Sequence, residues 1–144
     1  MKKSNNFDCY VKTVHNKPAS CAVNKAYIEF NEKQDFPFVG CIRVFMKMPE
    51  ENGLSSNDEY ETLTSIEKEL VSYTEFSQDA IYVGRSTSDG MRDFYIYLDD
   101  YERHIEPIEK VMSQFSEYEF ELGFRPDETW DVYYRFLLHQ QDHN

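Results

Sequence analysis

The stretch Ala80–Leu98, AIYVGRSTSDGMRDFYIYL, decides the fold of this chain. Two runs rich in aromatic and β-branched residues, 80–85 and 92–98, flank a polar segment that contains Asp89 and Gly90. Such runs are typical of β-strands. The Asp-Gly pair between them is a strong hairpin signal, because both residues tolerate the positive φ angles of a tight turn. The stretch therefore predicts an antiparallel hairpin.

Helical patterns lie on both sides of this hairpin. Residues 58–76 precede it with apolar residues at spacings of three and four, and Asp58 with Glu61 is suited to cap the first turn. Residues 101–115 follow it with a similar stripe that contains Pro107, where we expect a kink or a restart. Each predicted helix has one apolar face with which it can pack on a sheet.

Two further strands complete the pattern. Residues 36–47 are apolar on both faces, which is typical of a central strand covered on both sides. Residues 117–124 alternate strictly between large apolar residues and Glu or Gly, so one face is expected to meet the core and the other water. The order is thus strand, helix, strand, strand, helix, strand. It predicts an α+β fold with a mostly antiparallel sheet, the βαββαβ core of a ferredoxin-like sandwich.

The two ends of the chain are expected to extend this core. Residues 26–30, AYIEF, predict an extra N-terminal strand, and Asp127 is suited to cap a closing C-terminal helix. Residues 1–25 are polar and interrupted by proline, so we expect a partly irregular arm with room for a short strand at 8–14. A single α+β domain then covers residues 26–144.

The charge is large and unevenly distributed. The formal net charge is −12; residues 1–47 carry 8 basic and 4 acidic side chains, whereas residues 48–144 carry 7 and 23. Aromatic residues make up 16% of the chain, which indicates a packed core rather than a disordered acidic segment. An acidic field of this size repels phosphate backbones and anionic membranes and attracts basic proteins. We therefore expect neither direct nucleic-acid binding nor membrane binding.

Several features point to the cytoplasm. No apolar run approaches the roughly 20 residues that span a bilayer, and no apolar stretch follows the first two lysines, so we expect no secretory signal. The three cysteines, Cys9, Cys21 and Cys41, are an odd number without metal-site spacing, as is usual for reduced thiols.

Two short motifs suggest a family. The first is Arg-Asp-Phe-Tyr-Ile-Tyr in the second hairpin strand, and the second is Pro-Asp-Glu-x-Trp-x-x-Tyr at the start of the closing helix. The residues that carry them are Asp93, Phe94, Tyr95, Asp127, Trp130 and Tyr133. With these motifs, roughly the last 65 residues resemble the domain-of-unknown-function family number 695. That family is distantly similar in fold to the bacterial regulator of ribonuclease E activity B, a small acidic protein that inhibits by binding. The resemblance implies binding and supplies no catalytic residue.

No catalytic or cofactor-binding constellation is apparent. The cysteines form no CxxC pair, and residues 86–90 lack the glycines and lysine of a phosphate loop. His139 and His143 could share a helix face and hold a metal with Asp142, but a frayed terminus explains them better. His104 is expected at the edge of its helix rather than as a base. We expect no metal and no cofactor.

The leading hypothesis is a binding or regulatory module that docks to a protein with a basic surface. Its contact area would comprise the two acidic helices and the edge with Glu117, Glu119 and Glu121. Trp130 and Tyr133 could add aromatic contacts, although packing of the closing helix on the sheet explains the same spacing and is the favoured interpretation. The edge strand could also support a homodimer, and a toxin-neutralising protein would look the same.

The alternative is an enzyme or a small-molecule-binding domain. Its pocket would lie between the sheet and the C-terminal helix, where Arg85, Arg92 or Arg125 could clamp a carboxylate or a phosphate.

Overall fold

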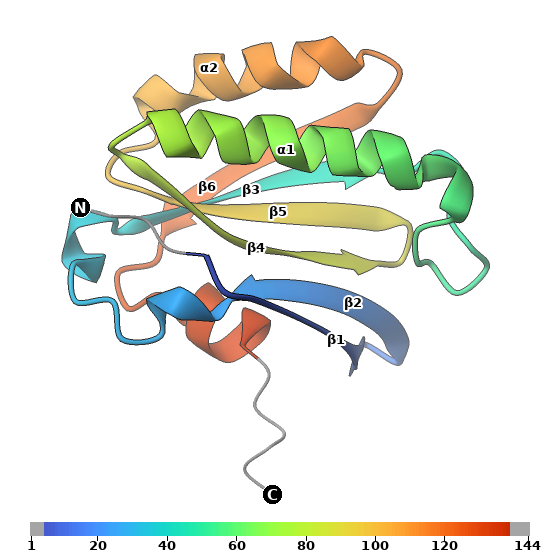
Figure 1. Cartoon of the computed structure of the whole chain (residues 1–144), viewed down its shortest axis with the longest axis horizontal. Coiled ribbons are helices and arrows are strands. Elements are labelled where there is room, and N and C mark those ends of the chain that lie inside the picture. Colours follow the sequence, from blue (N-terminus) through green and yellow to red (C-terminus); the bar gives the residue numbers. More distant parts are fainter. Residues whose placement is uncertain (1–4, 139–144) are drawn as a thin grey trace, which may run out of the picture.

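A computed structural model describes residues 5–138 of the chain. Its described part is an α+β fold: a six-stranded antiparallel sheet in the order β1-β2-β4-β5-β3-β6, with two α-helices on one face and the C-terminal segment on the other (Figure 1). The strands are β1 (Phe7–Val14), β2 (Lys17–Asn24), β3 (Phe38–Phe45), β4 (Ala80–Ser88), β5 (Met91–Leu98) and β6 (Glu119–Pro126). The helices are α1 (Tyr60–Phe76), α2 (Glu102–Met112), the 3₁₀ turns η1 (Lys25–Tyr27), η2 (Lys33–Asp35), η3 (Asn57–Glu59) and η4 (Ser113–Phe115), and the π-helical η5 (Val132–Leu137).

The predicted central hairpin is present. Strands β4 and β5 pair antiparallel and turn at Asp89 and Gly90, whose φ angles of 55° and 82° are those that an Asp-Gly turn requires. Strand β5 pairs with β3, and β3 pairs with β6, which forms one edge of the sheet. The alternation of residues in β6 is also confirmed, since its glutamates are exposed and its apolar residues pack on the core.

The two helices cover one face of the sheet. Helix α1 buries Leu63, Ile66 and Leu70 against this face, as its periodicity predicts. Helix α2 is one continuous helix that includes Pro107, so the expected restart is not observed. Proline removes a single backbone donor, and the buried side chains on either side of it keep the helix packed against the sheet.

The N-terminal prediction needs correction. Residues 26–30 form no strand, because the Asn24 side chain accepts a hydrogen bond from the Ala26 amide (3.0 Å) and starts the turn η1. The short strand expected at 8–14 is confirmed as β1, but the arm around it is not irregular: β1 and β2 form a hairpin that turns at His15 and Asn16 with φ angles of 51° and 68°. The extra N-terminal element is therefore a pair of strands, and β2 joins the sheet beside β4.

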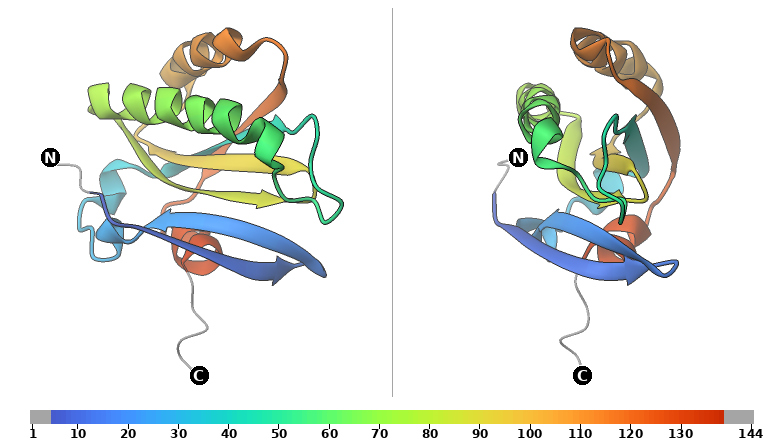
Figure 2. Two further views of the ribbon diagram at one scale, coloured as in Figure 1. Left: turned by 45° about the vertical axis from the view of Figure 1, so that its right-hand side comes forward. Right: turned by 90° about the vertical axis from the view of Figure 1, so that its right-hand side faces the viewer.

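The C-terminal segment packs on the face of the sheet opposite to the helices. Figure 2 shows it beside the hairpin β1–β2, and it contacts both β2 and β4. We call this side of the sheet the concave face. A second apolar core forms here, which includes Val23, Val39, Tyr97 and Trp130. The closing helix is shorter than expected and is π-helical. Among the described residues, no helix is long and apolar enough to cross a membrane.

Candidate functional site

Trp130 and Tyr133 are fully buried on the concave face, so their assignment to a partner-binding surface is corrected. The indole ring of Trp130 stacks on Tyr97 with ring centroids 4.0 Å apart, and its Nε1 donates to the Phe36 carbonyl at 2.9 Å. The Tyr133 hydroxyl donates to the Asn24 carbonyl at 2.5 Å. Both polar groups are thus satisfied inside the protein, which is what a buried Trp or Tyr requires.

Asp127 holds this segment in place. Its carboxylate accepts hydrogen bonds from the backbone amides of Asp131 (2.8 Å) and Val132 (3.0 Å) and from the Tyr97 hydroxyl (2.6 Å). The last of these bonds, together with burial, raises the pKa of Tyr97 far above its usual range, burial being the larger cause. The predicted cap residue Asp127 thus binds the first amides of the closing segment, but the helix itself begins after Asp131, whose side chain makes no capping bond.

The three candidate arginines do not converge on one pocket. Arg85 and Arg92 lie on the helix-covered face, because in the strand pairing they stand opposite Phe94 and Thr87 respectively and Phe94 belongs to the core under the helices. Arg125 stands opposite Val39, which packs on the concave face. An anion clamp formed by all three is therefore excluded by the alternation of side chains along the strands.

Arg125 does line a cavity beside the C-terminal segment. This cavity of about 320 Å³ lies between β3, β6 and Val132, and Cys41 and Tyr95 also contribute to its wall. Burial, and to a lesser extent Asp93, raise the pKa of the Cys41 thiol to about 12. A thiol of this kind stays protonated near neutral pH and is a poor nucleophile.

Beneath α1, Glu67 connects Arg85 with Tyr82. Its carboxylate accepts from the Arg85 guanidinium at 2.9 and 3.1 Å and from the Tyr82 hydroxyl at 2.8 Å. Burial raises the pKa of Tyr82 well above its ordinary value, and the neighbouring Glu67 charge adds to this effect. The Glu67–Arg85 pair is three-quarters or more buried, so solvent screens it less than a surface pair.

Arg92 lies next to this pair and is only 6% exposed. Its Nε donates to the Thr87 hydroxyl (2.8 Å) and one terminal nitrogen donates to the Ser55 hydroxyl (3.3 Å). None of the ion pairs within residues 5–138 includes Arg92. Burial, followed by repulsion from Arg85, lowers the pKa of Arg92 to about 10. Sequence alternation contains a signal for this burial, because Arg92 shares its face with Phe94.

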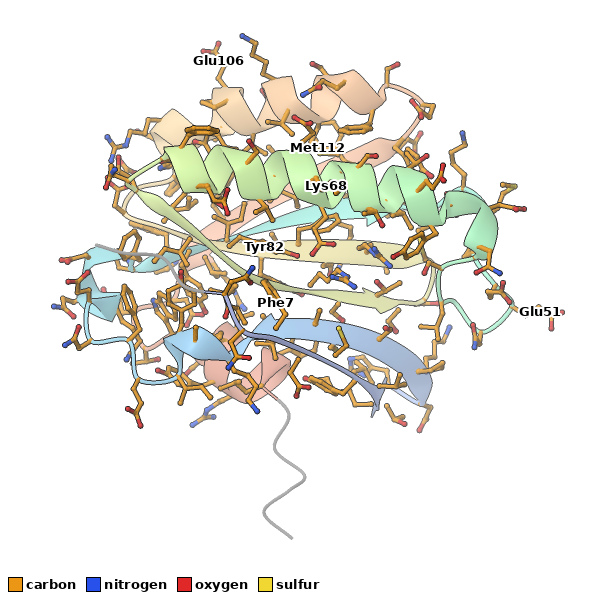
Figure 3. All side chains as sticks on the ribbon, in the orientation of Figure 1. Phe7, Glu51, Lys68, Tyr82, Glu106 and Met112 are labelled. Carbon is orange, nitrogen blue, oxygen red and sulfur yellow. The ribbon has the colours of Figure 1, made fainter. Side chains whose placement is uncertain are left out.

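A cavity of about 350 Å³ opens between α1 and the N-terminal hairpin. Figure 3 shows Phe7 beside Tyr82 below α1, where Lys68 is also labelled. These three residues line the cavity together with Glu67, Glu75, Asn24 and others. The centroids of the Phe7 and Tyr82 rings are 5.9 Å apart, so the cavity is lined on one side by aromatic rings. Glu67, Lys68 and Glu75 add charged side chains to its lining.

The concave face holds another polar cavity near the β1–β2 turn. It measures about 350 Å³ and contains the pair Arg43–Asp93, whose two bonds are 2.9 and 3.0 Å long. The Tyr95 hydroxyl donates to the same Asp93 carboxylate at 3.3 Å. The paired charges neutralise each other, so this pair has no net demand for a counter-ion.

Exposed carboxylates on α2 and on the edge strand β6 form an acidic strip along this edge of the sheet, with those of β6 on the face opposite to α2. Helix α2 packs beside β6, where Tyr101 stacks on Phe124 with ring centroids 5.6 Å apart. Six exposed glutamates lie on this side, and we call them the acidic α2–β6 surface: Glu102, Glu106, Glu109, Glu117, Glu119 and Glu121. Figure 3 shows Glu106 pointing away from the sheet. In the described part of the chain none of the six takes part in an ion pair. Helix α1, by contrast, packs over β4 and does not belong to this strip.

His104 is buried rather than placed at the helix edge as expected. Its Nδ1 is hydrogen-bonded to the Tyr73 hydroxyl, and its Nε2 lies 3.3 Å from an Asp99 carboxylate oxygen. Arg103 also pairs with Asp99, as well as with Asp79 at 3.1 Å. These contacts tie the end of α1 to the start of α2.

Metal ligands do not cluster within residues 5–138. The candidate ligands His139, Asp142 and His143 lie outside the described residues. The three cysteines are free thiols: Cys9 is exposed, Cys21 is buried and Cys41 is half-buried.

Comparison with protein families identifies the chain. The model of DUF695, a family of unknown function, matches residues 5–138. The chain belongs to the DUF695 family. The match includes the N-terminal hairpin and β3, well upstream of the two motifs that carry the resemblance. Neither the curated proteins nor the solved structures contain a significant match.

In this DUF695 protein, Phe94 belongs to the core under the helices, whereas the other motif residues meet on the concave face. Tyr95 and Asp93 line the polar cavity there, while Asp127, Trp130 and Tyr133 anchor the C-terminal segment. The second motif thus has a structural role in this chain, namely to fix the segment that covers the sheet.

Proposed function

We propose that this protein is a cytoplasmic regulatory module that docks to a basic protein through the acidic α2–β6 surface. The observation that carries the proposal is that six neighbouring carboxylates lack a cation partner among the described residues. The less exposed carboxylates Glu67 and Asp93, by contrast, are paired with arginines. A one-signed surface raises the association rate of an oppositely charged partner and repels a second copy of the same surface. The odd number of free thiols supports the cytoplasmic location.

We also infer that the central four strands adopt a ferredoxin-like arrangement. Its support is the antiparallel order β6-β3-β5-β4 with both α-helices on one face. In that case the protein is similar in fold to the bacterial regulator of ribonuclease E activity B. The corresponding mode of action is inhibition by binding, which rests on the analogy of fold.

Partner capture followed by affinity measurement tests the docking proposal. The wild-type chain is used to retain proteins from a nuclease-treated lysate at low salt, and a retained protein is then purified. Its Kd is measured calorimetrically at low and at high salt. We expect the affinity to fall with salt, because exposed charges are screened. Reversal of Glu117, Glu119 and Glu121 to lysine should weaken binding by about tenfold or more.

A charge-matched variant provides the control. Reversal of Glu29, Glu50 and Glu51 changes the net charge by the same amount, and these exposed residues lie outside the acidic α2–β6 surface. If both triple variants weaken binding equally, the net charge and not this surface is responsible. If neither variant alters the Kd, the docking proposal is refuted.

A second candidate function is the binding of a small molecule in the cavity under α1. The observation in its favour is the cavity of about 350 Å³ with aromatic and charged walls. A thermal-shift screen with metabolites tests it, since a specific ligand raises the melting temperature by mass action. A hit should lose its effect in Lys68→Ala and retain it in Lys110→Ala, because Lys110 lies on α2 away from the lining residues. Equal shifts in both variants would place the ligand elsewhere.

A further inference from the structure

Arg92 is a buried cation for which the described part of the chain offers no separate counter-ion. Its two hydrogen-bond partners, Thr87 and Ser55, are neutral hydroxyls. The carboxylate that influences it, Glu67, is already bonded to Arg85. Two guanidinium groups therefore share one carboxylate, which leaves one positive charge uncompensated. Buried charges are normally paired, because an isolated ion loses its hydration without a replacement.

Apart from the Glu67 carboxylate, which is bonded to Arg85, the polar groups bonded to Arg92 are hydroxyls that have a proton to donate. The Thr87 and Ser55 oxygens accept from the guanidinium, so each hydroxyl proton is directed elsewhere. Within residues 5–138, neither hydroxyl donates in any of the hydrogen bonds of the structure. The adjacent Ser56 hydroxyl is buried and lacks a hydrogen-bond partner among the described residues. Hydroxyl donors beside two guanidinium groups that share one carboxylate have the chemistry of an oxyanion site.

We propose that Arg92, Arg85, Ser55 and Thr87 bind a phosphate group, either as inorganic phosphate or as the phosphomonoester of a small molecule. The planar guanidinium matches two phosphate oxygens, and the hydroxyls can donate to the others. Ser55 and the largely exposed Tyr60, which also influences Arg92 electrostatically, lie on the solvent side of the site. This proposal does not depend on partner docking.

Thermal unfolding of the full chain at constant ionic strength tests the proposal. Sodium phosphate at neutral pH replaces sodium chloride in millimolar steps, and glycerol phosphate is titrated in a parallel series. We expect a saturable rise of several degrees in Tm with phosphate and none with chloride. The net charge of −12 disfavours non-specific anion binding, so a saturable response is diagnostic. A stronger response to glycerol phosphate than to inorganic phosphate would identify a phosphomonoester as the ligand.

Variants of Arg92 test whether the phosphate-dependent rise in Tm arises at this residue. Arg92→Met should unfold at the same or a higher temperature than wild type without phosphate, because it removes an uncompensated buried charge. The Tm of this variant should no longer rise with phosphate, and its Kd for phosphate from calorimetry should be at least about tenfold higher than that of wild type. Arg92→Lys keeps the charge without the planar fork and should bind more weakly than wild type. Arg135→Met removes an equal charge from an exposed site and should respond as wild type does.

Ser55→Ala keeps the test decisive if Arg92→Met fails to fold. Ser55 lies in a half-buried loop, so its replacement should preserve the fold and weaken the phosphate response. Equal shifts in wild type, Arg92→Lys and Ser55→Ala would overturn the proposal. So would a wild-type Tm that does not distinguish phosphate from chloride.

Discussion

Glu59 is the buried carboxylate whose replacement should destabilise the fold most clearly. It is 2% exposed and accepts three hydrogen bonds: from the Lys47 amide (2.8 Å), the Met48 amide (2.8 Å) and the Tyr118 hydroxyl (2.6 Å). These bonds connect the start of α1 with the end of β3 and with the residue before β6. A hydrogen bond to a charged group contributes about 1.5–3 kcal/mol. Glu59→Gln retains one acceptor oxygen and turns an NH₂ group toward a donor, so it should lose one or two of these bonds.

We therefore expect Glu59→Gln to lower the free energy of unfolding by about 2–4 kcal/mol at pH 7. Urea unfolding followed by the fluorescence of Trp130, the single tryptophan, measures this loss. Tyr118→Phe is the matched control, because it removes one donor and leaves the charge with its two amides; it should cost about 1–2 kcal/mol. A Glu59→Gln variant within about 0.5 kcal/mol of wild type would refute the argument.

The pH dependence of this loss provides a second criterion. Burial alone would raise the pKa of Glu59, but the bonds from Tyr118, Lys47 and Met48 favour the ionised form and lower it. The stabilisation is therefore complete above 4.5, the ordinary pKa of a glutamate side chain, and is lost as the pH falls through the lower pKa of the folded state. The gap between wild type and Glu59→Gln should close on acidification below that pKa and stay constant between neutral and mildly alkaline pH. A gap that persists in strong acid contradicts this account.

Two further predictions concern a glycine and the thiols. A Cβ at Gly84 would lie 2.3 Å from the Ala22 carbonyl oxygen, so Gly84→Ala should separate β2 from β4 and lower the free energy of unfolding in urea by more than about 2 kcal/mol. Gly123→Ala is the control: its Cβ meets nothing within 4 Å, so it should change the free energy of unfolding by less than about 0.5 kcal/mol. With a thiol reagent at pH 8, the exposed Cys9 should react first and Cys41 slowly, because burial raises the pKa of Cys41 to about 12. Loss of the fast phase in Cys9→Ser checks the assignment, and a fast phase that survives would contradict it.

The helix-covered half of the fold is accessible from the sequence because its signals are local. The Asp89-Gly90 turn and the apolar spacing of α1 each lie within one element and require no knowledge of the neighbours. The sequence allows a strand at 8–14, but its pairing with β2 in a hairpin escapes prediction for a physical reason. Its strand β1 pairs on one side only and exposes every second residue, and its turn uses His15-Asn16 instead of a glycine dipeptide.

The site residues are harder to assign because burial of polar side chains depends on non-local partners. The spacing of Trp130 fits a surface anchor as well as a core residue. Its indole ring is buried by contacts with Tyr97 and with the Phe36 carbonyl, both of which are distant in sequence. For Arg92 and Arg125, by contrast, a local signal is enough to predict on which face of the sheet each lies. Alternation along their strands puts Arg92 on a core face and Arg125 on the face of the glutamates, so strand parity is sufficient to separate the two.

The two proposed binding activities depend on charges of opposite sign in different environments, and salt separates them. The acidic α2–β6 surface is exposed, and its attraction for a basic partner decays over a Debye length of about 8 Å at physiological ionic strength. Arg92 is buried, so its interaction with a phosphate group is screened much less. Added sodium chloride should therefore abolish docking at concentrations that leave the phosphate-dependent rise in Tm largely intact. If both responses vanish together, the phosphate effect arises from surface charge and Arg92 is a structural residue.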